Sequence, residues 1–344
     1  MPAPKVEKPH RPRYRVILWG PGDEADAVMQ AARADPRFEV IAVASREELL
    51  TAEADCVVVA TDPMTPSIDL DAVVLGLLES GKNVVSIAAD TLPAARLREA
   101  CQRGGASIHR IGCLATLMIS RMVMTMVQGL CAVRHIRIVE ALDLLSTPER
   151  RSAAWALGFG RDAAGFDDDS RDSPPAGSGN LAHVIAMVAR DLYAAAATNV
   201  RIERTWRRIP AERGFAIEGG PVIEAGTVAA ICAIHRGYVD DRLFFTSEEW
   251  RYLGPDHAYR GDDLPYGGFR GPVSYAIQIQ ADPADLESQW DLERSGPVDL
   301  VSGSYARMIL DAIGPVCEAE PGVLLEDPSP RYSTTNLSII TRRT

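Results

Sequence analysis

A chain of 344 residues, 47% of them hydrophobic, is long enough for two domains with sizeable cores. Its formal net charge of −11 argues against a nucleic-acid surface and against binding to an anionic membrane. The six cysteines form no CxxC pair and no metal-ligand spacing, so we expect free thiols and no metal. No apolar run could span a bilayer, and residues 1–14 lack the apolar core of a signal peptide, so a cytoplasmic location is expected.

Short apolar strands alternate with helices over the first 110 residues, after a flexible lead at 1–13. The expected strands are 14–20, 38–44, 56–60, 83–87 and 106–109, and the expected helices are 23–35, 69–80 and 94–103. Such alternation is typical of βαβ units and a parallel sheet. It predicts an α/β fold that begins with a Rossmann-type dinucleotide-binding domain at 14–134.

The pattern changes after residue 114, where a Met-rich helical stretch leads into long strands. We expect helices at 114–130, 181–197 and 304–313, an ordered loop or lid at 161–180, and strands at 135–144, 200–209, 226–238, 242–252 and 272–281. These elements predict an α+β domain at 135–303, built on an open mixed or antiparallel sheet and serving substrate binding and dimerisation. About 304–344 would rejoin the first domain. An open apolar sheet face favours a homodimer.

The first strand runs into residues 20–25, GPGDEA, which match G-x-G-x-x-A. Gly20 permits the tight turn, Gly22 lets the backbone approach a pyrophosphate, and Ala25 lets the helix pack closely on the sheet. The helix N-terminus then offers unpaired N–H groups to the phosphates. Because the motif follows a strand and opens a helix, it predicts nucleotide binding rather than a merely structural turn.

The end of the second strand indicates which nucleotide binds. An acidic residue there would accept a hydrogen bond from the ribose of NAD, but the chain has Ser45-Arg46, and an arginine pairs with the 2′-phosphate of NADP. NADP is therefore favoured, with NAD still possible. The alternative is a solvated Arg46 for which Glu47 and Glu48 compete. The expected cofactor-binding residues are Gly20, Pro21, Gly22, Asp23, Ala25, Ser45, Arg46, Thr61, Pro63, Ala88 and Gly112.

Several segments occur in the order found in one known family. They are Gly20-Pro21-Gly22, the run ESGKNVV at 79–85, a strand containing Glu140 and Asp143, and ARMILDAIGPVCEAEPG at 306–322. The chain resembles the dihydrodipicolinate reductase-like group that includes 2,4-diaminopentanoate dehydrogenases and native amine dehydrogenases. That resemblance implies a Rossmann domain, a dimerising α+β domain, and NAD(P)-dependent interconversion of an amine with a ketone and ammonia.

Two departures from the family pattern affect the expected chemistry. The family places a glutamate just after the fourth strand, where a carboxylate can hold the amine and move a proton. Here only Asp90 is available, and it could equally cap a helix that starts near Pro93. The family's Gly-Thr-Gly-x-Asn-Pro-Gly loop beside the nicotinamide is also altered, since only Gly112 survives at 111–117.

Further candidates lie in the second domain. Glu140 is either a polar group at the floor of a pocket or one of an outward-facing set, and with Asp90 it is a candidate catalytic residue. The candidate substrate-binding residues are Leu114, Met118, His183 and His257. The set Met118, Met122, Met124 and Met126 is interpreted as core packing rather than a substrate wall, and the Asp167–Asp169 run as solvated rather than metal-binding.

The sequence therefore predicts an NADP-dependent oxidoreductase that acts on a small amine/ketone pair. Reduction of another imine or carbonyl without ammonia is the alternative within enzymes, because the family glutamate is missing. A cofactor-binding protein that has lost catalysis is the alternative of a different class.

Overall fold

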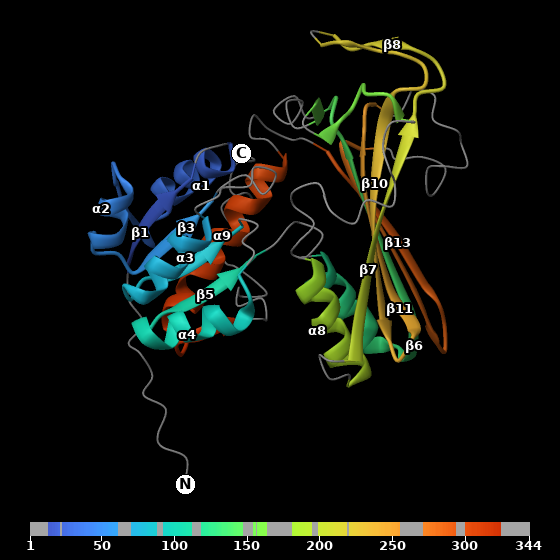
Figure 1. Ribbon diagram of the computed structural model, residues 1–344. Helices are drawn as coiled ribbons and strands as arrows, with labels where there is room; N and C mark the ends of the chain where they lie inside the picture. Colours follow the sequence, from blue (N-terminus) through green and yellow to red (C-terminus); the bar gives the residue numbers. More distant parts are fainter. Residues whose placement is uncertain are drawn as a thin grey trace, which may run out of the picture. The chain divides into compact units, whose positions relative to one another are not determined.

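The computed structural model describes residues 13–20, 23–60, 70–87, 92–111, 118–146, 154–155, 157–163, 181–194, 199–218, 220–254, 271–293 and 300–324. The chain forms two compact units (Figure 1). The first contains the elements up to residue 111 together with those from 302 onward, and the second contains the described elements between them. No helix among the described residues is long and apolar enough to cross a membrane.

A parallel six-stranded sheet forms the centre of the first unit, in the order β14-β5-β4-β3-β1-β2. Its strands are β1 (Tyr14–Trp19), β2 (Phe38–Ile41), β3 (Cys56–Val59), β4 (Asn83–Ser86), β5 (Ser107–Arg110) and β14 (Gly322–Leu324). Its helices are α1 (Asp23–Ala34), α2 (Arg46–Thr51), α3 (Leu70–Glu79), α4 (Ala94–Gly104) and α9 (Leu300–Glu318). All four residues of β3 are fully buried, as expected for a parallel strand covered on both faces.

Helices cover both faces of this sheet. Buried side chains of α2, α3 and α4 form one core with alternate residues of the strands. On the other face, the Tyr14 hydroxyl of β1 donates a 2.5 Å hydrogen bond to Glu318 of α9, and Cys317 of α9 contacts Cys56 of β3. Helix α9, from the far end of the sequence, therefore completes the core of the first unit.

Two glycines allow α3 and α4 to approach closely. A Cβ atom on Gly104, the last residue of α4, would lie 1.8 Å from the backbone oxygen of Leu78 in α3. Gly81, which follows α3, has a φ of +85° and would place its Cβ 3.2 Å from the backbone oxygen of Gly104. The two helices therefore meet backbone to backbone, which side chains at these positions would prevent.

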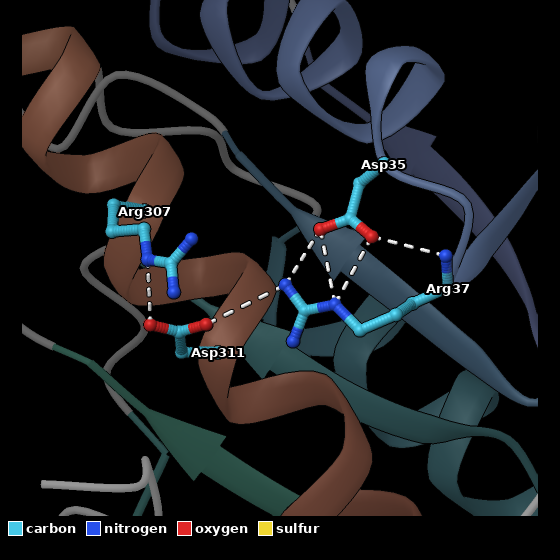
Figure 2. Close-up of polar contacts among 4 residues, drawn as sticks. All are labelled: Asp35, Arg37, Arg307 and Asp311. Carbon is cyan, nitrogen blue, oxygen red and sulfur yellow. Dashed lines mark hydrogen bonds and ion pairs between the residues drawn. The ribbon is translucent and has the colours of Figure 1, made fainter. Parts of the chain in front are cut away.

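An ion-pair cluster fastens α9 to the segment between α1 and β2 (Figure 2). Asp35 pairs with Arg37 at 2.6 Å, Arg37 reaches Asp311 of α9 at 3.5 Å, and Asp311 pairs with Arg307 at 2.8 Å. Burial raises the pKa of Asp35, but the hydrogen bonds from Arg37 outweigh burial and lower that pKa below its usual value. Alternating signs of charge let these partly buried groups compensate one another.

A mixed six-stranded sheet, in the order β13-β12-β6-β11-β10-β7, dominates the second unit. Its strands are β6 (Cys131–Asp143), β7 (Val200–Pro210), β10 (Val228–Val239), β11 (Arg242–Tyr252), β12 (Val273–Asp282) and β13 (Leu286–Leu292). Strands β6 and β11 pair in parallel, and the other neighbours are antiparallel. A small hairpin joins β8 (Phe215–Ala216) to β9 (Val222–Ile223).

Helical elements accompany this sheet. They are the π-helical turn η1 (Met118–Val123), the short helix α6 (Met124–Met126), the 3-10 turn η2 (Val127–Gly129) and α8 (Leu181–Tyr193). Helix α8 packs against the sheet at Gly237 of β10. A Cβ atom on Gly237 would lie only 2.6 Å from the side chain of Ile185 in α8. Figure 1 shows α8 beside the strands of this sheet.

The predicted fold class is confirmed: a Rossmann-type α/β unit with a second unit built on a mixed sheet. The sequence analysis missed α2, β13, β14 and the β8–β9 hairpin. The second strand ends at Ile41 rather than at residue 44, and the last helix runs over Leu300–Glu318, with Pro315 inside it, rather than over 304–313. Strand β13 lies at the edge of its sheet and has no buried residue, so its sequence lacks a marked apolar face.

Interpretation of the methionines as core was wrong. The buried residues of 118–129 are Ile119, Val123 and Val127, spaced four apart along one helical face. Met118 lies one residue ahead of that face and is partly exposed, and Met122 is 38% exposed.

Candidate functional site

Gly20, directly after β1, has the positive φ expected of a glycine in a tight turn. β1 ends at Trp19, Gly20 has a φ of +135°, and α1 begins at Asp23. A φ in that region is strained for any residue with a Cβ. Ala25, in the first turn of α1, is 8% exposed, so its small side chain packs between helix and sheet. Pro21, Gly22 and the side chain of Asp23 lie outside the described residues.

Ser45 and Arg46 begin α2 rather than end β2. The Ser45 hydroxyl accepts a 3.1 Å hydrogen bond from the Glu48 backbone N–H, and the Glu48 carboxylate accepts one of 2.7 Å from the Ala44 N–H. This reciprocal pair is a capping box, which fixes where the helix starts. Arg46 is exposed at the first helical position. Glu48, named as a competitor for Arg46, is engaged in this cap.

Several predicted site residues lie outside the part of the chain that the structure describes. They are Thr61, Pro63, Ala88, Asp90, Gly112, Leu114 and His257. His183 lies in a helix, as predicted, because α8 covers its position. Its side chain is not among the parts that the structure describes. The structure therefore describes only part of the expected site.

Glu140 lies in a buried charged cluster on the sheet of the second unit. Its residue is 6% exposed, and its two carboxylate oxygens accept hydrogen bonds from Arg251 at 2.6 Å and from the Tyr275 hydroxyl at 2.5 Å. Burial lowers the pKa of Arg251, but the charges of Glu140 and Glu249 outweigh burial and raise that pKa above its usual value. The sequence left Glu140 either buried as a polar group or facing outward, and the structure shows it buried.

Glu249 was missed by sequence reasoning. It is the register partner of Glu140 on the neighbouring strand β11, so the two carboxylates leave the same face of the sheet from strands about 4.8 Å apart. Glu249 is 8% exposed. Burial raises its pKa to about 7, with the charge of Glu140 adding to the rise and Arg251 opposing it. A buried carboxyl group that titrates near neutrality is characteristic of functional sites.

His235 of β10 lies on the same face of this sheet. It is fully buried, and neither ring nitrogen has a hydrogen-bond partner among the described residues. Burial lowers its pKa to about 4, with the charge of Arg204 contributing, so the ring is neutral at physiological pH. On β10, Ala233 is the register partner of Glu249, and His235 follows two residues later on the same face. This face therefore carries a neutral imidazole near Glu249.

Asp143, the other acid that the family resemblance singled out, serves the backbone. Its carboxylate accepts hydrogen bonds from the Leu145 N–H and the Gly254 N–H, both at 2.9 Å, and from the Ser146 hydroxyl. It therefore joins the loops that follow β6 and β11, directly beyond Glu140 and Arg251. This is a positioning contact for the ends of the two strands that carry the charged cluster.

A hollow of about 470 Å³ lies elsewhere, at the amino ends of the first sheet, lined by Arg15 and by residues 50–55 and 80–82. Lys82 donates hydrogen bonds there to the Leu50 carbonyl at 2.5 Å and to the Ser80 hydroxyl at 3.2 Å. Ligands of open α/β sheets bind at the carboxyl ends of the strands, so this hollow is not the expected nucleotide site.

No protein-family model and no curated protein matches this sequence. Among solved structures, the chain is similar to an amine dehydrogenase from Mycobacterium smegmatis, with 16% identity over 94% of this chain and 98% of that one and a TM-score of 0.65. It is also similar to a probable dehydrogenase from Thermotoga maritima, with 11% identity over 91% of this chain and 92% of that one and a TM-score of 0.51.

A third similar structure is the biliverdin reductase from Synechocystis sp. PCC 6803 in complex with biliverdin and NADP+. It has 14% identity to this chain, covers 91% of this chain and 94% of its own, and gives a TM-score of 0.50. At these identities the likeness shows a shared two-unit fold, which is the one predicted from the sequence.

Proposed function

We propose that this chain is an NADP-dependent oxidoreductase that interconverts a small ketone plus ammonia and an amine by hydride transfer. The observation that carries the proposal is the β1–Gly20–α1 turn. It lies in a doubly wound parallel sheet between strands β3 and β2, where the order of the chain reverses. Nucleotides bind at such switch points. The likeness in fold to an amine dehydrogenase supports the amine/ketone assignment.

The residues present fit a dinucleotide. A positive φ at Gly20 and a small Ala25 are what a phosphate-binding turn needs, and the first N–H groups of a helix such as α1 are suited to binding phosphates. NADPH, when bound, supplies the hydride. The chain's own contribution in this proposal is to hold the phosphates at residues 20–25 and to contact the 2′-phosphate with Arg46.

We expect NADPH to bind more tightly than NADH, because Arg46 stands at the start of α2 with its side chain exposed. Arg46→Ala should remove most of the difference, about 1.5–3 kcal/mol for a charge-assisted contact. Calorimetric titration of both cofactors measures this. Arg103→Ala, at an exposed ion pair of α4, is the matched control and should leave the preference intact. Equal affinities in the unmodified protein would contradict the assignment.

The proposed proton-handling group is Asp90, in the place where the family carries a glutamate. Asp90→Asn should abolish amine formation and leave NADPH affinity nearly unchanged, whereas Asp90→Glu should preserve or raise the rate, because the carboxylate must reach the reacting nitrogen. A turnover screen of ketones with NADPH, with and without ammonium, measures both. An active Asp90→Asn enzyme would remove Asp90 from the mechanism. Turnover without ammonium would favour the alternative, an imine or carbonyl reductase.

A further inference from the structure

The run ESGKNVV at 79–85 forms the end of α3, a tight turn and the start of β4. Gly81 has a φ of +85° in this turn. The side-chain amide of Asn83 donates a 2.8 Å hydrogen bond to the Asp55 carbonyl and accepts one of 2.9 Å from the Ser107 N–H. The turn is thereby tied to the chain on both sides of β4, so the lysine within it starts from a fixed backbone.

That lysine, Lys82, is a buried cation that is held without an acid. It is 6% exposed, and its ammonium donates hydrogen bonds to the Leu50 carbonyl at 2.5 Å and to the Ser80 hydroxyl at 3.2 Å. Among the residues that the structure describes, no carboxylate pairs with it, and burial lowers its pKa. A buried charge without an opposite charge is costly. The contact that this charge makes with Leu50 therefore needs a reason.

The Leu50 carbonyl belongs to the last turn of α2, where carbonyl groups have no partner within the helix. A cation at this end also compensates the negative end of the helix dipole. Lys82 therefore caps α2 from the neighbouring turn. Capping would stabilise any helix, but this helix carries Arg46 at its other end.

Helix α2 links the two edges of the first sheet. It joins β2 to β3, and both strands are parallel to β1, so it starts on the side of the carboxyl edge and ends on the side of the amino edge. Nucleotides bind at the carboxyl edge. The helix has six residues, so it is about 9 Å long. A helix this short is not stable alone, and its contacts with the rest of the fold set its orientation.

Leu49 is the fixed point of α2. Its side chain is fully buried in the core, and it lies between Arg46 and Leu50 in the sequence. The capping bonds of Ser45 and Glu48 stay within the segment that they cap, so they turn with the helix. Release of the Leu50 carbonyl would let α2 rotate about Leu49, and such a rotation moves Arg46.

We propose that Lys82 is a positioning residue that sets the preference for NADPH. By holding the Leu50 carbonyl, it keeps α2 in the orientation in which Arg46 meets the 2′-phosphate. Lys82 lines the hollow at the amino ends of the strands, so it acts through Arg46 and does not touch the cofactor. The effect on NADPH rests on the proposed function, whereas the anchoring of α2 by Lys82 does not.

The first experiment is a double-mutant cycle on cofactor affinity. Calorimetry measures NADPH and NADH binding to the full-length unmodified protein, Lys82→Met, Arg46→Ala and the double variant. Lys82→Met should weaken NADPH binding about tenfold and NADH binding less than about twofold, because only NADPH carries the phosphate that a displaced Arg46 misses. In the Arg46→Ala background, Lys82→Met should leave the ratio of the two affinities unchanged. Equal weakening of both cofactors by Lys82→Met, or the same change of ratio in both backgrounds, would overturn the proposal.

Arg103→Met is the matched control for Lys82→Met. It removes a cation at the end of α4 whose described partners are Glu79 and Glu99, and it should leave both affinities unchanged. Lys82→Met should fold, because the burial of Leu49 and the packing of the Leu50 side chain against α3 remain. Circular dichroism checks this, and a loss of folded protein lowers both apparent affinities without changing their ratio.

Amide hydrogen exchange measures the anchoring of α2 without a cofactor. The N–H groups of Leu49 and Ala52 bond to the carbonyls of Ser45 and Glu48. In Lys82→Met these amides should exchange at least about fivefold faster than in the unmodified protein, because the helix opens locally more often. Arg103→Met should exchange as the unmodified protein does. Exchange in Lys82→Met at the rate of the unmodified protein would overturn the proposal.

The two measurements separate this inference from the proposed function. A protein that binds neither cofactor, or binds both equally, contradicts the proposed NADP-dependent oxidoreductase, and hydrogen exchange still decides whether Lys82 anchors α2. A protein that prefers NADPH to the same degree with and without Lys82→Met contradicts only the inference.

Discussion

Replacing Gly104 with alanine is expected to destabilise the first unit severely, by on the order of 3 kcal/mol. The added Cβ would lie 1.8 Å from the Leu78 oxygen and 2.8 Å from the Leu78 carbonyl carbon. Both are backbone atoms of α3, which cannot move aside by changing a rotamer, so α3 and α4 must separate. The measurement is chemical denaturation followed by circular dichroism. The intrinsic preference of helices for alanine would favour the substitution by only about 1 kcal/mol.

Gly129→Ala is the matched control for this substitution. Gly129 also lies in a helical turn, but a Cβ there meets nothing within 4 Å, and its φ is not in the left-handed region. The free energy of unfolding of the Gly129→Ala protein should differ from that of the unmodified protein by no more than about 0.5 kcal/mol, as for surface substitutions generally. A Gly104→Ala protein as stable as Gly129→Ala would show that α3 and α4 do not meet as described.

Removal of Arg251 should have an effect of similar size in the second unit. Arg251→Met removes the guanidinium that pairs with Glu140 at 2.6 Å and leaves Glu140 beside the buried Glu249 of the paired strand. Breaking a buried ion pair by removing one partner costs about 3–5 kcal/mol. The loss should grow as the pH rises from 5 to 8, because burial and the charge of Glu140 raise the pKa of Glu249 and Arg251 no longer opposes that rise. Denaturation curves at several pH values measure this.

Glu140→Gln in the Arg251→Met background should recover most of that loss, since the charge left without a partner is removed. Arg137→Met is the control: Arg137 pairs with Glu248 on the opposite face with 30% of its side chain exposed, and partly exposed pairs contribute about 1 kcal/mol or less. If the Arg251→Met and Arg137→Met proteins lose equal stability, the cluster around Glu140 is not buried in solution.

The Rossmann unit was predictable because its signals are local. Strand β3 is a continuous apolar run, and Gly20 ends β1 where the chain must turn. Strand β13 was missed because none of its seven residues is buried, so its sequence lacks a marked apolar face. Helix α2 was missed because six residues are too few to show a period.

The charged cluster could not be predicted in the same way. Glu140, Glu249, Arg251 and Tyr275 meet because β6 pairs with β11 and β12, strands that lie more than a hundred residues away in the sequence. The resemblance to a family pointed to Glu140 alone. The sequence of β11 did contain a sign of the cluster. Side chains two residues apart share a face of a strand, so Glu249 and Arg251 lie on the same face as the buried Phe245. The homodimer and the assigned domain limits stay predictions.

The first unit is assembled from both ends of the chain, and this determines when it can form during synthesis. Helix α9 covers one face of its sheet, and β14 pairs with β5 at its edge, yet both follow the whole second unit in the sequence. As the chain leaves the ribosome, strands β1 to β5 therefore wait with an apolar face and an edge uncovered while nearly two hundred more residues are added. The Arg37–Asp311 contact closes only then. We therefore expect the nascent first unit to expose apolar surface until α9 and β14 have been synthesised.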